Sequence, residues 1–259
     1  MTDSARHFGR HWHATYGVGL LVDGAQTSAS GCGVVDAYAG DVITTNPGEV
    51  HDGRPLGGPS RRWRMLYVDP SAFGLLTDGA SAGADVALTR PVIQDPALKR
   101  ALLQLFSRLD AWRSAPCADR AVLLACEEAL ARSGHLLLRR HGSAAPAREV
   151  AGEVRQARDR LADELLGPPT LEELAGMSGL SKYQLLRRFE KAYGLPPHAW
   201  LQQQRAERAR ALIRRGAGLA EAATACGFAD QSHMTRCFMR LFGFTPGAWR
   251  KAVCPGAAG

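Results

Sequence analysis

The C-terminal part of this 259-residue chain contains an internal repeat, and this repeat limits the possible folds more than any other feature of the sequence. Three segments recur at an offset of 49 residues: Arg187-Arg188-Phe189 with Arg236-Cys237-Phe238, Tyr193-Gly194 with Phe242-Gly243, and Pro197-His198-Ala199-Trp200 with Pro246-Gly247-Ala248-Trp249. Upstream, Leu174-Ala175 and Gly179-Leu180 recur at an offset of 48, so the second copy has one extra residue in its turn or at the start of its following helix. Such a repeat predicts one supersecondary unit that occurs twice.

The first copy has the sequence of a helix, a tight turn and a second helix. Thr170-Leu-Glu-Glu173 and Ser181-Lys-Tyr-Gln184 are capping boxes, in which two side chains satisfy backbone N–H groups at a helix start. Gly179 lies between them and tolerates the positive φ of a tight turn. Because two short helices joined so tightly meet at a steep angle, residues 170–194 are predicted to form a helix-turn-helix unit.

The second copy, at residues 218–243, follows the same plan. Leu219–Cys226 is its expected first helix, Gly227 its turn, and Asp230 the N-cap of its second helix. Between the copies, Pro197–Arg215 has a proline in its first turn and an apolar stripe at helical spacing. We expect this segment to be a rigid helical spacer.

Positive charge is concentrated in the same region. Residues 151–259 contain 16 Lys and Arg against 10 Asp and Glu, whereas residues 1–150 contain 16 against 15, so the repeat region carries +6 of the net charge of +7. This distribution is typical of a surface that neutralises phosphate groups, although a solvated charged face is the alternative.

The N-terminal part has the pattern of a β-rich domain followed by helices. Its short apolar stretches are separated by Gly, Pro, Asp and Ser; they are Tyr16–Val22, Gly33–Tyr38, Asp41–Thr45 and Arg64–Val68. Beyond Pro91, leucines recur at helical spacing, and Ala121–Leu138 is a second helical run. The segments Pro96–Trp112 and Ala118–Arg140 are expected to form a dimer contact or to transmit a signal. His141–Ala147 has the small, turn-prone composition of a linker.

Two further features narrow the class of protein. No apolar run is long enough to cross a bilayer and no N-terminal segment resembles a secretory signal, so we expect a cytoplasmic protein without a membrane partner. The cysteines contain no C-x-x-C pair and are expected to be reduced and mostly buried; they are Cys32, Cys117, Cys126, Cys226, Cys237 and Cys254.

The segment Thr170–Arg250 resembles the DNA-binding domain of the AraC/XylS family of bacterial transcription regulators. The residues that carry the resemblance are Leu-Glu-Glu-Leu-Ala-x3-Gly-Leu-Ser, Arg-x-Phe-x4-Gly-x2-Pro, Arg205-Ala-x2-Arg208-Ala and, in the second copy, Gly-Phe-x-Asp-Gln-Ser-x3-Arg-x-Phe-x4-Gly-x-Thr-Pro. Two positions depart from the family pattern: Ala222 replaces a larger aliphatic residue, which is expected to loosen the second core, and His233 replaces an aromatic or small residue.

The resemblance implies that two recognition helices, Ser181–Tyr193 and Asp230–Phe242, enter successive major grooves about 34 Å apart. The candidate base-reading residues lie in the N-terminal half of each helix and are Lys182, Tyr183, Gln184, Leu186, Arg187, Gln231, Ser232, His233 and Arg236. Arg187 and Arg236 are equivalent in the repeat, and a guanidinium suits bidentate contact with guanine. A phosphate clamp or solvated surface remains the alternative for both. Trp200 and Trp249 are expected to be core anchors.

The N-terminal region resembles the cupin-like sensor domain of the same family. His11-Trp-His13 and the segment Gly40–His51 are versions of the two cupin signatures. On a strand, His11 and His13 would point to one face, and a third imidazole could converge with them. The glutamate that normally follows the histidines in metal-binding cupins is absent.

These residues predict a polar effector pocket formed by His11, His13, Glu49, His51 and Trp63. Structural histidines and a metal centre are the alternatives, and neither a metal nor another cofactor is assigned. Trp63 shares one face of a strand with Met65 and Tyr67, which either line the same pocket or pack in the core.

We therefore predict an α+β multidomain protein: a cupin-like effector-sensing β-barrel at residues 1–90, a helical appendage at 91–142, a linker at 143–151 and an all-α tandem helix-turn-helix domain at 152–259. The expected function is effector-controlled transcription regulation, not catalysis. A metal-dependent cupin enzyme of the dioxygenase type is the alternative, and a barrel that serves only for dimerisation is a third possibility. The expected partners are operator DNA, a small molecule, a second copy of the chain and RNA polymerase.

Overall fold

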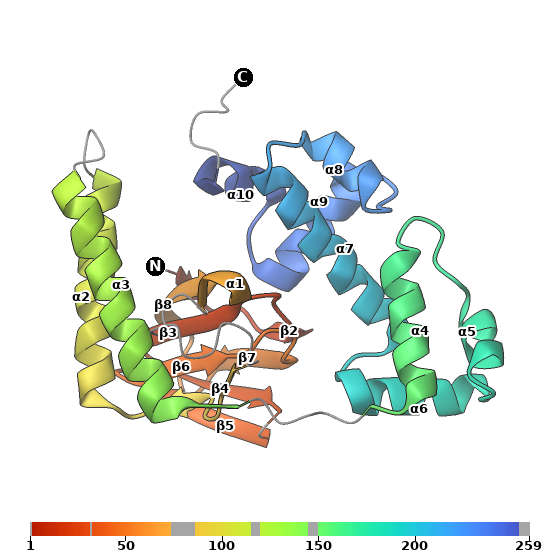
Figure 1. Cartoon of the computed structure of the whole chain (residues 1–259), viewed down its shortest axis with the longest axis horizontal. Coiled ribbons are helices and arrows are strands. Elements are labelled where there is room, and N and C mark those ends of the chain that lie inside the picture. The colour runs from red at the N-terminus through yellow and green to blue at the C-terminus, as the bar shows by residue number, and fades with distance from the viewer. Residues whose placement is uncertain (1, 32, 74–85, 115–119, 145–149, 254–259) are drawn as a thin grey trace. The chain divides into compact units, whose positions relative to one another are not determined.

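The computed structural model describes residues 2–31, 33–73, 86–114, 120–144 and 150–253 (Figure 1). Contacts divide the chain into two compact units, one of residues 1–7 and 12–147 and the other of residues 148–259 together with residues 8–11. Because strand β2 (Phe8–His11) belongs to a sheet with strands of the first unit, we describe it there. Each unit is described by itself.

The first unit contains two larger sheets and a two-stranded ribbon. The five-stranded sheet has the order β1 (Thr2–Ser4), β8 (Arg61–Val68), β3 (Tyr16–Asp23), β6 (Val42–Thr45) and β10 (Val92–Ile93). The four-stranded sheet has the order β2, β7 (His51–Pro55), β4 (Ala25–Ser30) and β5 (Gly33–Tyr38). Strands β9 (Val86–Leu88) and β11 (Gly142–Ala144) form the ribbon, and α1 is a single turn at Pro70–Phe73.

The two faces of the five-stranded sheet have different neighbours. Tyr16, Val18 and Leu20 of β3 alternate along the strand and are buried in one core with the helices α2 (Pro96–Ser114) and α3 (Arg120–His141). On the opposite face, the buried Arg61 of β8 donates from Nε to Oε1 of Gln26 in β4, at 3.0 Å. The helices therefore cover one face, and the other face is directed toward the four-stranded sheet.

Helices α2 and α3 pack against each other (Figure 1) and are also tied together by Asp95. The Asp95 carboxylate accepts from the backbone N–H groups of Ala97 and Leu98 and from the guanidinium of Arg140. Burial would raise the pKa of Asp95, but these hydrogen bonds, with one from His141, hold it far below its ordinary value. The start of α2 is thereby fixed to the end of α3.

The second unit is entirely helical. Its elements are α4 (Gly152–Asp163), α5 (Leu171–Met177), α6 (Lys182–Tyr193), α7 (Pro197–Arg214), α8 (Leu219–Ala225), α9 (Gln231–Phe242) and α10 (Pro246–Val253). Helix α7 packs on α6 from the first copy, on α8 and α9 from the second, and on the flanking helices α4 and α10. It is the spacer that the sequence predicts.

The predicted repeat is confirmed. Helices α5 and α8 have seven residues each, and α6 and α9 have twelve each. Residues 178–181 separate the first pair and residues 226–230 the second pair, so the extra residue lies in the second turn. Both turn glycines have positive φ, +60° at Gly179 and +75° at Gly227.

The four predicted strands correspond to β3, β5, β6 and β8, and the α+β fold class is confirmed. The strands that were not predicted are β1, β4, β7, β9, β10 and β11. The first two residues of the predicted linker at residues 143–151 belong to a short strand, because Gly142–Ala144 pairs with β9. Residues 145–149 of that linker lie outside the described residues.

The described cysteines, Cys126, Cys226 and Cys237, are free and buried, and burial raises the pKa of the last two. The other three lie outside the described residues. Among the helices described, none has the length and apolar character needed to span a membrane.

Candidate DNA-binding helices and effector site

Helix α6 begins at a complete capping box and presents a polar face to solvent. Gln184 N–H donates to the Ser181 hydroxyl, and Ser181 N–H donates to Gln184 Oε1 at 2.9 Å. Leu185 and Phe189 are fully buried, which fixes the rotation of the helix. The opposite face carries the predicted base-reading residues, of which Lys182, Tyr183, Gln184 and Arg187 are exposed and Leu186 is half-buried.

Several of these side chains on α6 already have neighbours. Lys182 lies 3.6 Å from the Glu172 carboxylate, a contact between two exposed groups. The Arg187 guanidinium lies 5.6 Å from the ring centroid of Tyr183, which is 67% exposed. Arg187 and Tyr183 therefore form a stacked pair on the solvent-facing side.

Helix α9 begins differently, because Asp230 caps it without a capping box. The Asp230 carboxylate accepts from His233 N–H at 2.6 Å. The His233 ring lies edge-on against Phe228 at 5.3 Å and is half-buried, whereas Gln231, Ser232 and Arg236 are exposed. Of the predicted residues on α9, His233 is thus engaged with its own unit and the other three face solvent.

A buried arginine of the spacer α7 links the segment after α4 to the second turn. Arg205 of α7 donates from Nε to the carbonyl of Leu165 at 3.0 Å, and its second nitrogen Nη2 donates to the same carbonyl. Burial lowers the pKa of this guanidinium. A Cβ atom at Gly227 would lie 2.5 Å from the Leu165 carbonyl oxygen, so the second turn is packed directly on this link. The sequence motif includes Arg205 but does not reveal this role.

The tryptophans of the repeat are core anchors, as predicted. Trp200 is buried and meets Phe189 edge-on. Trp249 packs at the edge of the second core, and its indole N–H donates to the carbonyl of Arg210 at 3.1 Å. Ala222 is fully buried in that core; the predicted loosening at this position stays a prediction.

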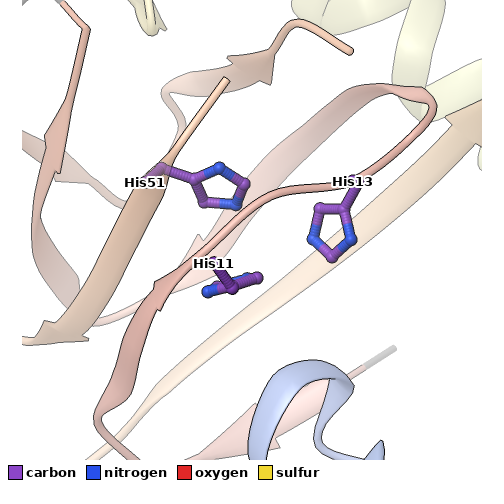
Figure 2. Close-up of side chains that lie close together, drawn as sticks. All are labelled: His11, His13 and His51. Atoms are coloured by element: carbon purple, nitrogen blue, oxygen red, sulfur yellow. The ribbon is translucent and has the colours of Figure 1, made fainter. Parts of the chain in front are cut away.

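In the first unit, His11, His13 and His51 lie together (Figure 2). Each offers one ring nitrogen, and these nitrogens lie within 4.8 Å of one another. His11 and His13 are both buried, and His51 is half-buried. The three residues form what we call the histidine cluster.

The predicted reason for this convergence was partly wrong. Strand β2 ends at His11, so His13 does not alternate with it on a strand. Instead the chain leaves the sheet, and the His13 carbonyl accepts from the N–H of Gly48 at 2.8 Å. This bond places His13 beside the loop that leads to His51.

The structure places Glu49 and Trp63 differently from the histidines. The Glu49 carboxylate accepts from the backbone and side-chain nitrogens of Asn46, at 3.0 and 2.8 Å. It stabilises the loop and is not part of the histidine cluster. Trp63 is half-buried under the guanidinium of Arg61, 4.8 Å from its ring centroid. Binding of an effector by either residue stays a prediction.

The same sheet face contains Thr45, which the sequence analysis missed, and Tyr67, which it expected either to line the pocket or to pack in the core. Gly17 of β3 pairs with Thr45 on one side and with Tyr67 on the other, and the Tyr67 ring meets the His13 ring at 5.1 Å. The Thr45 hydroxyl is buried, with no hydrogen-bond partner among the described residues. Thr45, Gly17 and Tyr67 therefore form a row across three neighbouring strands, and the Thr45 hydroxyl and the Met65 side chain lie over Gly17, which has no side chain of its own. A glycine that alternates with buried residues in a strand was the available signal.

Comparisons with known proteins agree with this division. Residues 174–252 match the model of a helix-turn-helix domain, and residues 2–125 match the model of an AraC-like ligand binding domain. The HTH-type transcriptional regulator YbfI of Bacillus subtilis is 26% identical over 228 residues, which cover 88% of this chain and 81% of YbfI. The transcriptional activator NphR of Rhodococcus is 37% identical over 83 residues, 32% of this chain and 24% of NphR.

Among solved structures, ToxT from Vibrio cholerae has the same fold over nearly its whole length. The TM-score is 0.53, the sequence identity is 10%, and the alignment covers 95% of this chain and 94% of ToxT. By contrast, the MtrA regulator of Neisseria gonorrhoeae, like NphR, is matched over only about a quarter of its length, 27%. The YbfI and ToxT matches include both units, whereas these two relatives share only a segment.

Proposed function

Because the chain belongs to the AraC/XylS family of transcription regulators, we propose that α6 and α9 read the bases of two neighbouring major-groove segments. The chain is a DNA-binding regulator with a ligand-sensing N-terminal domain. The relatives that match it regulate transcription, so it is a regulator and not a dioxygenase.

One observation carries the proposal for base reading: the exposed faces of α6 and α9 are matched in position but differ in chemistry. At the offset of 49 residues, Lys182 corresponds to Gln231 and Tyr183 to Ser232, while Arg187 corresponds to Arg236. All six side chains are exposed. Two helices with the same geometry and different side chains would read two different half-sites, so the site for one chain would be asymmetric.

Gln184 and His233 have a weaker claim as base readers. The Gln184 carboxamide oxygen is used at the capping box, and the His233 ring packs on Phe228. We keep both as predicted DNA contacts. Each also stabilises the start of its own helix. Leu186 is half-buried and would make at most an apolar contact, such as with a thymine methyl group.

The test of DNA binding uses the full chain and a randomised duplex library. Repeated selection followed by sequencing is expected to yield one asymmetric motif with two half-sites about one helical turn apart. Fluorescence anisotropy on the selected duplex should then show affinity falling steeply with salt, because the second unit carries the positive charge. Selection of no motif, or binding insensitive to salt, would overturn the proposal.

For sensing, we propose that the effector binds at the histidine cluster and the adjacent row of Thr45 and Tyr67. A buried hydroxyl, an aromatic ring and three imidazoles provide the few convergent polar groups that a small-molecule site needs. The test is a thermal-shift screen of the full chain against a metabolite library, since a ligand that binds only the folded state raises its stability. The hits should lose their effect in a Tyr67→Ala, Thr45→Val variant.

A route from this site to the helices is available through β8. Arg64 lies between Trp63 and Met65 on the opposite face of the strand, and its guanidinium makes a bidentate pair with Asp110 of α2, both bonds at 2.8 Å. The same guanidinium stacks on Phe106. We propose that an effector that shifts β8 alters α2 through this contact.

We further propose that α2 and α3 bind a second copy of the chain. Large apolar side chains remain exposed on these helices, namely Leu103, Trp112, Leu123 and Leu124. Analytical ultracentrifugation of Leu124→Glu against the matched surface change Arg132→Glu tests this, and only the former should dissociate the dimer. A regulator that binds operator DNA would act in the cytoplasm, and it could contact RNA polymerase at the promoter. Both remain predictions.

A further inference from the structure

The three rings of the histidine cluster are arranged as a ligand set. We infer that His11, His13 and His51 bind one divalent transition-metal ion of the class of Zn²⁺, Co²⁺ or Ni²⁺. Their ring nitrogens lie within 4.8 Å of one another, and the rings converge on one space (Figure 2). Ligand nitrogens in a tetrahedral zinc site with bonds of about 2.0–2.1 Å are roughly 3.4 Å apart. Side-chain rotations that move the ring nitrogens by roughly 1 Å therefore complete the site.

Backbone carbonyls fix the tautomer of two of the three rings. Nδ1 of His11 lies 2.7 Å from the carbonyl oxygen of Gly9, and Nδ1 of His51 lies 2.9 Å from the carbonyl oxygen of Glu49. A carbonyl oxygen can only accept, so in both rings Nδ1 carries the hydrogen and Nε2 keeps its lone pair. This arrangement, with one ring nitrogen donating to a carbonyl and the other facing the metal, is the usual one for histidine ligands.

The site can also be assigned a metal preference. The cluster contains no carboxylate, and the one acidic group of the adjoining loop, Glu49, is bonded to Asn46. Three neutral imidazoles suit Zn²⁺, Co²⁺, Ni²⁺ or Cu²⁺, whereas Mg²⁺ and Ca²⁺ require oxygen ligands. Burial of His11 and His13 at 6% exposure each removes competing water from two of the three ligands.

Three protein ligands leave at least one coordination position for water or another small ligand. The proposed sensing function assigns the same cluster to the effector, and the role of the ion in sensing rests on that proposal. Metal binding itself does not. No redox step is implied, because the ion acts here as a binding group.

The experiment measures metal binding to the full chain without DNA or effector. The protein is treated with a chelator, dialysed and titrated with Co²⁺, whose visible absorption reports nitrogen ligands, and separately with Zn²⁺ by calorimetry. We expect one ion per chain and no response to Mg²⁺. Melting temperature should rise with Zn²⁺ concentration in the wild type, because the ion binds the folded state.

Three variants decide which residues bind. The single changes His13→Gln and His51→Gln, which keep a polar side chain of similar size, should each lower the affinity at least about tenfold. The matched control His135→Ala removes an exposed histidine of the same unit and should leave affinity and stoichiometry unchanged. Circular dichroism of each variant establishes that it is folded.

The inference is overturned if the wild type binds less than half an equivalent of Co²⁺ and Zn²⁺, or if folded His13→Gln and His51→Gln variants bind as the wild type does. Either result would leave the proposed DNA binding intact, since that is measured separately on the selected duplex. Loss of DNA selection with retained metal binding would, in turn, overturn the proposed base reading and leave this site standing.

Discussion

The two helix-turn-helix units have the same backbone and different surroundings. Their helices match in length, and their turn glycines, Gly179 and Gly227, both have positive φ. A Cβ atom at Gly179 would meet nothing within 4 Å, whereas one at Gly227 would collide with the Leu165 carbonyl and crowd the Arg205 guanidinium. The first turn is open, and the second is packed on the link between Arg205 of α7 and the Leu165 carbonyl.

The difference shows that one sequence motif can serve two structural purposes. In the first helix-turn-helix unit, two complete capping boxes define the starts of α5 and α6, so local hydrogen bonds specify the fold. In the second helix-turn-helix unit, α8 begins at Gly218, which has no side chain to act as a cap, and stability comes from a core that includes Phe228, Met234 and Phe238. The four predictions below test this contrast.

The largest expected effect is that of Gly227→Ala. A non-glycine residue with positive φ costs about 1–2 kcal/mol, and forcing a methyl group into a packed site adds about 1–3 kcal/mol. Opening of α7 to α9, measured by hydrogen exchange and mass spectrometry on the full chain, should become easier by the sum of these two costs.

Gly179→Ala is the matched control. It carries only the cost of positive φ, about 1–2 kcal/mol, because no atom lies within contact distance of the added methyl group. Equal destabilisation by the two variants would mean that the second turn is not packed on the link, and the contrast between the units would disappear.

Arg205→Met should have the next largest effect. Methionine keeps the apolar stem but leaves the buried Leu165 carbonyl without its two guanidinium donors, which costs about 1–3 kcal/mol. Arg208→Met, at an exposed position of the same helix, should change the same hydrogen-exchange free energy by less than about 0.5 kcal/mol. If both variants behave alike, Arg205 is not a structural link.

Sequence patterns predicted the helical unit well because its signals are local. Capping boxes, positive-φ glycines and the 49-residue offset each act within a few residues, so Ser181, Asp230 and Gly227 were assigned correctly from the sequence. The role of Arg205 could not be predicted, because its partner Leu165 is 40 residues away. A pattern of charged and apolar residues does not distinguish a buried arginine from an exposed one.

The histidine cluster illustrates the opposite case. The three histidines were grouped correctly, but the expected strand geometry was wrong, since β2 ends at His11. Glu49 was included because it lies within the signature segment Gly40–His51, and its carboxylate is instead bonded to Asn46. Thr45 was not found, because its proximity to Tyr67 depends on the pairing of both β6 and β8 with Gly17.

Arg187→Ala and Arg236→Ala compare the two units as DNA readers. Each is expected to cost roughly 1–3 kcal/mol on the selected duplex and to relax preference at one base position of its own half-site. Arg236 has no ion pair among the described residues, whereas Arg187 stacks on Tyr183, so Tyr183→Ala should weaken only the first half-site. Anisotropy against single-base variants of the duplex measures this. The control is Arg139→Ala, which removes the same charge from helix α3 of the N-terminal unit. Uniform weakening on all sequences would identify a phosphate contact instead.

The smallest expected effect is a dependence of α5 on pH that α8 should show more weakly. Glu173 accepts from the backbone N–H and the hydroxyl of Thr170, at 2.7 and 2.9 Å, whereas Glu221 accepts from Gly218 N–H at 3.2 Å and from no other group among the described residues. The bonds from Thr170, the backbone one first, lower the pKa of Glu173.

Since the pKa of Glu173 is lower in the folded state than in the unfolded chain, its capping contribution is fully present above the unfolded value of about 4.3 and is lost as pH falls through the folded value. Hydrogen exchange of the α5 peptide, corrected for the intrinsic rate at each pH, should therefore show easier opening in acid. Glu173→Gln keeps an acceptor for the Thr170 N–H but cannot titrate, so it should flatten this profile without abolishing the cap. An unchanged acid profile in Glu173→Gln would mean that another carboxylate controls α5, and the capping contrast between the two units would then lack an energetic basis.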